Sequence, residues 1–304
     1  MILYFSKINM NSTELFDVYK DKGKLFYIRG LLLQALKDNT IYTDEKFYYD
    51  EDKVRHDVST IYKMRIKEKT DTVVHGIIYK NAKIYSKEEN KATGELKSKI
   101  VPTIEDVKFY FDVTKEIVGF HTRNRFGYQE FNIVFENLLN AGMKEMNQEF
   151  SFSVSLYNEG VDINEIENKL KEINNIKRLI FDFKLPNPSD DNLLSKLEEG
   201  LDDTLEQLET ANAHCMSVIF DSDGKIGLNI DSEEIQKNII RIGKLHSAIS
   251  DKKATKNNYA SVKAIGKNGK IYSTEEEKPI KRAIDHESEF LWACADTIKS
   301  LFRG

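Results

Sequence analysis

The sequence predicts an α+β fold in two lobes, with mixed or antiparallel sheets and flanking helices. Strand-like runs dominate residues 41–122, whereas short strands alternate with helices after residue 149. The chain has no regular β-α-β-α-β series, so a doubly wound sheet is not expected. Its 304 residues are enough for two cores of moderate size. We therefore expect an N-terminal α+β domain at 1–148 and a C-terminal α+β domain at 149–304.

The N-terminal domain begins with a short alternating segment that predicts a strand. Residues 13–36 have helical spacing, and residues 128–143 return to it. Between these helices we expect four or five strands, at Ile41–Tyr49, Ser59–Ile66, Thr72–Tyr79, Val107–Val113 and Ile117–Thr122. The last two are separated by three residues, which predicts a hairpin. Residues 80–99 are rich in Lys and Glu and are expected to form a long, mobile connection.

The C-terminal domain is expected to open with a β-α-β unit and to end with a helix. Its predicted elements are strands at 150–157 and 178–185 with a helix at 164–173 between them, and helices at 191–211, 232–250 and 284–302. The segment Pro186-Asn187-Pro188 ends the second strand. Asp223-Gly224 and Asn268-Gly269 each lie between strand-like runs and predict hairpin turns. The leucine stripe of the helix at 191–211 fits either core packing or a subunit interface.

Sequence motifs of common enzymes are absent, so we expect no catalytic residue and no cofactor. There is no P-loop, no G-x-S-x-G, no H-E-x-x-H and no G-x-G-x-x-G. Cys215 and Cys294 lack metal-ligand spacing, so neither a bound metal nor a disulfide framework is expected. Asp182-Phe183-Lys184 fits the acid-x-Lys pattern of metal-dependent nucleases, in which carboxylates hold the metal. With 50 acidic and 45 basic residues, such patterns occur by chance, so this match alone does not identify a nuclease. A metal-dependent nuclease effector stays an alternative.

The N-terminus gives no sign of export or membrane insertion. It has no basic region followed by a long apolar stretch, and no apolar run in the sequence approaches about 20 residues. We therefore expect a cytoplasmic protein.

The net charge of −5 conceals an uneven distribution. Residues 186–234 carry 13 acidic and 2 basic side chains, whereas residues 235–274 carry 9 basic side chains and one acidic side chain. Lys and Arg neutralise phosphates and release counterions, which supplies most sequence-independent affinity for DNA. The basic segment therefore predicts DNA-binding residues, namely Arg241, Lys244, Lys252, Lys253, Lys256, Lys263, Lys267 and Lys270. A solvated face that only neutralises the acidic segment is the alternative.

A second basic cluster, Arg123-Asn124-Arg125, follows the last predicted N-terminal strand. Guanidinium groups bind phosphates and carboxylates through paired hydrogen bonds. Arg123 and Arg125 are therefore further candidate DNA-binding residues. A strand end closed by salt bridges would give the same pattern.

Several motifs carry a family resemblance. Phe109–Asp112, Phe120–Asn124 and Ile180–Asp191 resemble the aromatic strand, the E-T-R-N-like strand end and the R-P-N-P-D-D-like exit of a bacterial family of unknown function found in defence contexts. Tyr259–Tyr272, followed by a closing helix, is similar to the RexA-like DNA-binding proteins of phage exclusion. The RexA-like strand carries Arg-x-Lys, whereas this chain has only Lys263 there, and Lys267 would take the place of the second cation.

The resemblance implies a homodimer that binds double-stranded DNA without strong sequence preference and acts in anti-phage defence, phage exclusion or abortive infection. It also implies a separate effector protein and leaves open whether that effector is membrane-bound. Together with the basic segment, it favours a non-enzymatic DNA-binding sensor. An acidic protein-interaction module without a nucleic-acid role is a further alternative.

Overall fold

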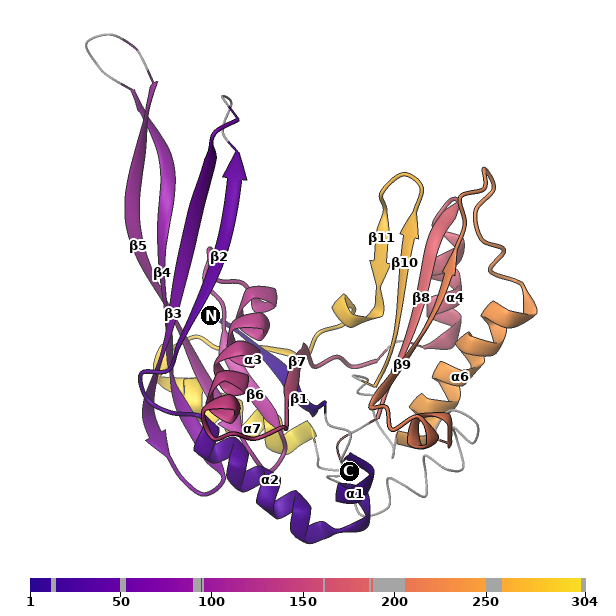
Figure 1. Cartoon of the computed structure of the whole chain (residues 1–304), viewed down its shortest axis with the longest axis horizontal. Coiled ribbons are helices and arrows are strands. Elements are labelled where there is room, and N and C mark those ends of the chain that lie inside the picture. The colour runs from indigo at the N-terminus through magenta and orange to yellow at the C-terminus, as the bar shows by residue number, and fades with distance from the viewer. Residues whose placement is uncertain are drawn as a thin grey trace.

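Two antiparallel sheets with helices packed on their faces form the framework of the protein (Figure 1). The computed structural model describes residues 1–11, 15–49, 53–89, 94, 96–160, 162–185, 187, 206–249 and 259–301. Every strand pair within these residues is antiparallel. The predicted α+β class is confirmed.

The larger sheet is curled and has the strand order β12-β1-β6-β5-β4-β3-β2, with β7 also paired to β1. Its strands are β1 (Ile2–Met10), β2 (Ile41–Tyr49), β3 (Arg55–Lys69), β4 (Val73–Glu89), β5 (Leu96–Asp112), β6 (Ile117–His121), β7 (Phe152–Leu156) and β12 (Lys281–Ala283). β5 and β6 pair as far as Asp112 opposite Ile117, which confirms the predicted hairpin.

The expectation of a mobile connection at residues 80–99 is wrong for residues 80–89 and 96–99, whereas residues 90–93 and 95 lie outside the described residues. β4 and β5 pair continuously from Val73 opposite Asp112 to Glu89 opposite Leu96. This long hairpin projects beyond the rest of the sheet (Figure 1). The sequence of this Lys- and Glu-rich segment lacks the alternation of a half-buried strand, so its periodicity does not predict strands.

Helices cover both faces of the larger sheet. They are α1 (Leu15–Lys20), α2 (Lys22–Ala35), α3 (Tyr128–Glu145) and α7 (Phe290–Leu301). Phe131 of α3 stacks on Phe120 of β6, with ring centres 3.7 Å apart. A Cβ atom on Gly142 would lie 2.0 Å from the carbonyl oxygen of Ala35, so glycine allows α2 and α3 to touch. On the other face, the buried Cys294 of α7 packs against Gly119.

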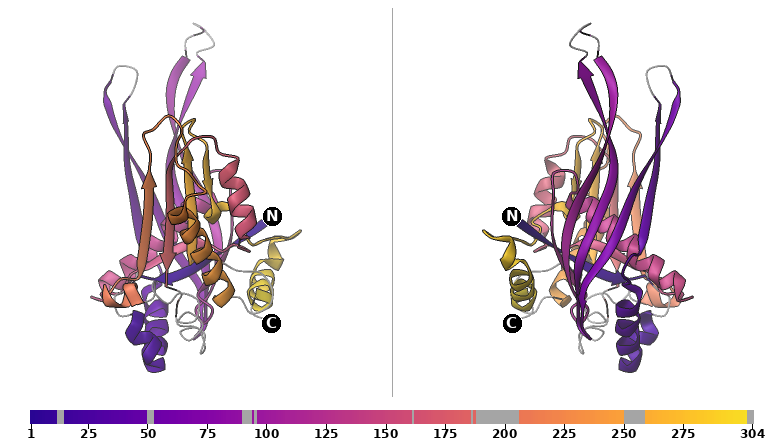
Figure 2. Two further views of the ribbon diagram at one scale, coloured as in Figure 1. Left: turned by 90° about the vertical axis from the view of Figure 1, so that its right-hand side faces the viewer. Right: turned by 90° about the vertical axis from the view of Figure 1, so that its left-hand side faces the viewer.

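The smaller sheet has the order β11-β10-β8-β9. Its strands are β8 (Ile176–Lys184), β9 (Cys215–Asp221), β10 (Ala260–Gly266) and β11 (Ile271–Ser273), and its helices are α4 (Ile163–Lys171) and α6 (Glu233–Ile249). Both helices lie on one face of the sheet (Figures 1 and 2). Alternate residues such as Phe181 and Val262 are fully buried in the core, whereas Lys263 and Ile219 are exposed on the open face.

Three sequence predictions fail in the C-terminal half. β7 and β8 belong to different sheets, so they do not form a β-α-β unit. Asp223-Gly224 does not form the predicted hairpin turn, because the element after β9 is the helix α6. The loop between them contacts β8 through a hydrogen bond of 2.8 Å from Leu228 N to Ile176 O. The last helix begins at Phe290 rather than at residue 284, because β12 and a short 3-10 turn, η2 (Glu287–Glu289), precede it.

The hairpin predicted at Asn268-Gly269 is confirmed as the connection between β10 and β11. Gly269 has a φ of +80°, which favours glycine, and its amide donates to Gly266 O at 3.0 Å. Of the helix expected at 191–211, residues 206–210 are helical and the part up to residue 205 lies outside the described residues. Leu208 is buried in the core.

The two sheets share one continuous hydrophobic core, which includes both Phe109 of the larger sheet and Phe181 of the smaller one. The chain also crosses between them more than once. β7 and β12 both follow residue 148 in sequence, yet both pair with β1. The sheets therefore do not coincide with the segments 1–148 and 149–304.

Asn187, from the Pro-Asn-Pro segment, connects the smaller sheet to the larger one. Its Nδ2 donates to Ile8 O at 2.6 Å and to Glu116 Oε2 at 2.7 Å, and its Oδ1 accepts from Met10 N at 2.8 Å. Glu116 also pairs with Lys7 at 2.9 Å, and both of these side chains are about 95% buried. The exit from β8 is thus held against β1 by a buried polar cluster.

None of the helices in the described residues is both long and apolar enough to span a membrane.

Candidate nucleic-acid interface

The β10–β11 hairpin presents three exposed lysines. Lys263 lies on the open face of β10, and Lys267 and Lys270 flank the turn. None of the three has a carboxylate partner among the described residues. The turn itself is held by bonds from Lys267 N to Asn175 O and from Lys270 N to Asn268 Oδ1, both of 3.0 Å. The backbone of the turn is therefore fixed, and the described carboxylates leave the three ammonium groups unpaired.

Two lysines that the charge analysis did not select lie at the same end of the small sheet. Ile176 pairs with Gly266, so the exposed Lys177 next to it lies at the end where the β10–β11 turn is. The loop after β9 carries exposed Lys225 and packs back on Ile176. Within the described part of the chain, neither lysine has a carboxylate partner. Arg178 at this end is paired with Asp221 at 3.4 Å.

Arg241 and Lys244 are not part of this group. Both lie on α6, which covers the opposite face of the sheet. The guanidinium carbon of Arg241 is 5.6 Å from the ring centre of Phe183, and its Nη1 donates to Asn238 Oδ1 at 3.4 Å. Arg241 thus contributes to helix packing, whereas Lys244 is exposed. Lys252, Lys253 and Lys256 lie outside the described residues.

Arg123 and Arg125 lie on the larger sheet, in the tight turn between β6 and α3. The turn is closed by two backbone bonds between Arg123 and Phe126, of 3.0 and 3.1 Å. Both arginine side chains are exposed, and neither has a salt bridge to a described carboxylate. The predicted basic residues are therefore distributed over the hairpin, α6 and the larger sheet rather than gathered on one face.

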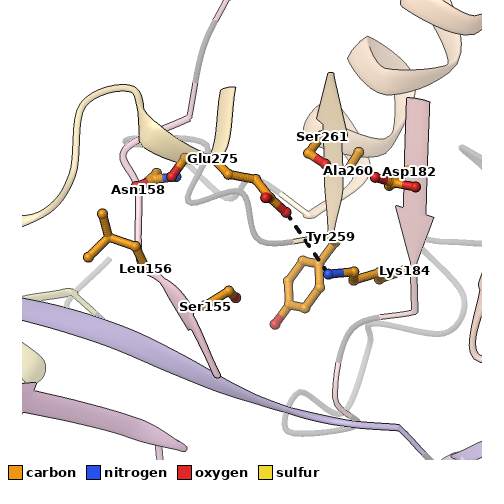
Figure 3. Close-up of a pocket in the computed structure, with 9 residues that line it drawn as sticks. All are labelled: Ser155, Leu156, Asn158, Asp182, Lys184, Tyr259, Ala260, Ser261 and Glu275. Atoms are coloured by element: carbon orange, nitrogen blue, oxygen red, sulfur yellow. Dashed lines mark hydrogen bonds and ion pairs between the residues drawn. The ribbon is translucent and has the colours of Figure 1, made fainter. Parts of the chain in front are cut away.

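A polar pocket lies where the two sheets meet (Figure 3). Its lining includes Asp182 and Lys184 of β8, Tyr259 before β10, and Glu275 from the short 3-10 turn η1 (Thr274–Glu276). Lys184 Nζ is 4.0 Å from Glu275 Oε1, and Asp182 accepts a bond from Ser217 Oγ. Residues two apart on a strand share a face, which explains why both ends of the Asp-x-Lys sequence line the pocket. Within the described chain, no group of three or more His, Cys, Asp or Glu residues is arranged to hold a metal ion.

His121 is buried at the end of β6, beside the Arg123 turn. Its Nε2 accepts the backbone N–H of Lys108 at 3.0 Å, which requires the neutral imidazole, and burial lowers the pKa of His121. The unfolded chain therefore takes up a proton at higher pH than the folded chain, and stability falls as the pH drops below the ordinary histidine range of about 6.5. We expect a smaller loss of stability between pH 7 and pH 5 in His121→Gln than in the wild type.

Urea unfolding at several pH values measures this effect. His286→Gln removes an exposed histidine and is the matched control, which is expected to keep the wild-type pH dependence. Equal pH dependence in His121→Gln and the wild type would show that His121 is not responsible.

Comparison with known proteins identifies a family of unknown function. A family model described as a domain of unknown function, DUF4747, matches residues 43–289. The match covers most of the chain, so the protein belongs to this family. No curated protein and no solved structure matches this chain.

Proposed function

We propose that this protein is a non-enzymatic double-stranded DNA-binding protein that recognises DNA largely independently of sequence. The observation that carries the proposal is the group of three exposed lysines on the β10–β11 hairpin, Lys263, Lys267 and Lys270, none of which pairs with a described carboxylate. Ammonium groups contact phosphates as point charges and carry no base information, so such a group favours affinity over sequence specificity.

The surroundings of the hairpin support this proposal. Lys177 and Lys225 extend the positive charge at the same end of the sheet. The two long hairpins of the larger sheet, β2–β3 and β4–β5, project toward the same side of the molecule as β10–β11 (Figure 1).

For the biological role, we propose anti-phage defence, phage exclusion or abortive infection in the cytoplasm, with the protein acting as a homodimeric sensor. This role rests on the similarity of Tyr259–Tyr272 to the RexA-like proteins. A separate effector protein would then carry out the response to DNA.

Titration of a fluorescently labelled duplex of random sequence tests DNA binding directly. Anisotropy is measured over a series of salt concentrations, and two unrelated duplex sequences are compared. We expect similar affinities for both and a steep loss of affinity with salt. The absence of binding at low salt would reject the proposal.

A metal-dependent nuclease is the second candidate, and the shared pocket position of Asp182 and Lys184 favours it. Incubation of plasmid DNA and RNA with the protein and Mg²⁺ or Mn²⁺ separates the two functions. A binding protein leaves both substrates intact. Cleavage that is lost in Lys184→Ala would establish the nuclease instead.

A further inference from the structure

β9 is the last strand of the smaller sheet, at its β8 side. Ser222 N donates to Lys177 O at 2.8 Å and Leu185 N donates to His214 O at 3.1 Å, so the even-numbered residues of this strand face the β8 ladder. Hydrogen bonding alternates along an antiparallel strand. The N–H and C=O groups of the odd-numbered residues, such as Ser217 and Ile219, therefore point away from β8, in the plane of the sheet. No strand of the described chain pairs with this side.

This edge lacks the features that normally prevent pairing between strands. The segment from Cys215 to Phe220 has no proline and no charged residue, and its pairing with β8 runs without a bulge. Ile219 is 47% exposed, and Val218 is half-buried. Such an edge can accept another strand at little cost.

The sequence of β9 is complementary to itself in the antiparallel direction. A two-fold axis at Val218 places Val218 opposite its own copy, Met216 opposite Phe220, Ser217 opposite Ile219, and Cys215 opposite Asp221. No like charges face each other, and an apolar residue with an apolar partner occupies each position on the helix side. The odd residues, whose backbone groups point outward, pair with odd residues, so the four positions Cys215, Ser217, Ile219 and Asp221 can hydrogen-bond across the interface.

The other edges are less suited to self-pairing. β2 is an edge of the larger sheet, but its centre is Asp44-Glu45-Lys46, and pairing about Glu45 would place two carboxylates opposite each other. β11 and β12 have only three residues each. β7 is an uncharged edge strand of five residues, but the amides of Phe152 and Val154 already donate to Asn140 Oδ1 and Glu136 Oε2, both at 2.9 Å. Among the described edge strands, β9 therefore best combines length, an uncharged centre and outward backbone groups with no described partner.

We propose that a second copy of this chain pairs antiparallel with β9, about a two-fold axis at Val218, and joins two four-stranded sheets into one sheet of eight. The interface specifies the homodimer of the proposed function but does not depend on DNA binding. Because the axis reverses strand direction, the two β10–β11 hairpins lie at opposite ends of the joined sheet. The dimer thus presents two separate basic ends.

A proline at position 219 tests the interface without breaking the β8 ladder. The amide of Ile219 points outward, so Ile219→Pro removes a hydrogen-bond donor of the proposed dimer and none of the monomer. Ile271→Pro is the matched control. It changes the same residue type on the other edge, where Gly266 N bonds to Lys270 O and the Ile271 amide likewise points outward.

Sedimentation at micromolar protein concentration, without DNA, measures the number of chains per particle. We expect two chains per particle for the wild type and Ile271→Pro, and one chain for Ile219→Pro, with unchanged circular dichroism for all three. A monomeric wild type, or a dimeric Ile219→Pro, would overturn the interface. Since DNA is absent, neither result bears on the proposed DNA binding.

Cross-linking tests the register even if Ile219→Pro fails to fold. In a Cys215→Ser background, Val218→Cys brings two cysteines opposite each other across the axis, at a separation of about 4.5–5.5 Å between Cβ atoms, and mild oxidation is expected to give a covalent dimer. Ser217→Cys in the same background faces Ile219 and is expected to stay uncross-linked. Failure of Val218→Cys to cross-link, or equal cross-linking in both variants, would contradict the register.

Discussion

Replacement of Lys263, Lys267 and Lys270 together by alanine is expected to weaken binding to duplex DNA by more than about tenfold at low salt. Each phosphate contact contributes about 0.9 to the slope of log affinity against log salt, so the loss of three contacts lowers that slope by about 2.7. The three side chains are exposed and have no ion pair to lose among the described residues, so the fold is expected to remain intact. Anisotropy titration over a salt series measures both quantities.

A matched variant separates local contacts from net charge. Lys67, Lys281 and Lys299 are also exposed. Lys67 and Lys281 lie on β3 and β12 of the larger sheet, and Lys299 lies on α7, which packs against that sheet. Their joint replacement by alanine removes the same charge, and we expect less than a threefold loss of affinity. An equal loss in the two triple variants would indicate a diffuse electrostatic effect and would reject the hairpin as the binding site.

Glu116→Ala is expected to reduce the free energy of unfolding by about 3–5 kcal/mol. Glu116 is 4% exposed, pairs with Lys7 at 2.9 Å and accepts from Asn187 at 2.7 Å. Without the carboxylate, the buried Lys7 ammonium loses its counter-ion and Asn187 loses an acceptor. Because Asn187 holds the exit of β8 against β1, the smaller sheet is also expected to detach more easily from the larger one.

Urea unfolding measures this loss, and hydrogen exchange shows where it acts. Glu209→Ala is the control, because its salt bridge with Lys20 at 3.0 Å is exposed and such pairs contribute about 0–1 kcal/mol. If Glu116→Ala does not fold, Glu116→Gln keeps the shape and removes only the charge. Wild-type stability in Glu116→Gln would contradict the structural role of the Lys7–Glu116 pair.

Local patterns explain which elements could be predicted. The bounds of β2 were predicted at Ile41–Tyr49, and the β10–β11 turn at Asn268-Gly269, because strand propensity and turn chemistry are properties of neighbouring residues. The strands within residues 80–99 were missed because this Lys- and Glu-rich sequence has no alternation of apolar and polar residues. The pairing of β7 with β1 was missed because partner choice is decided by packing between distant segments.

The candidate site shows the same division. Lys267 and Lys270 were predicted together because they lie on either side of the Asn268-Gly269 turn signal. Lys177 and Lys225 were missed because they join the hairpin only through the pairing of Ile176 with Gly266 and the bond from Leu228 to Ile176. Conversely, Arg241 was grouped with the lysines by sequence proximity, whereas it packs on Phe183 behind the sheet.

Lysine acetylation with and without DNA tests the proposed binding surface most directly. Exposed lysines are modified with a short pulse of reagent, and mass spectrometry compares the yield at each position. We predict strong protection by duplex DNA at Lys263, Lys267 and Lys270, weaker protection at Lys177 and Lys225, and none at Lys67, Lys281 and Lys299. Protection of Lys67, Lys281 and Lys299 in place of the hairpin lysines would contradict the proposed binding surface. So would the absence of protection at Lys263, Lys267 and Lys270 while DNA is bound.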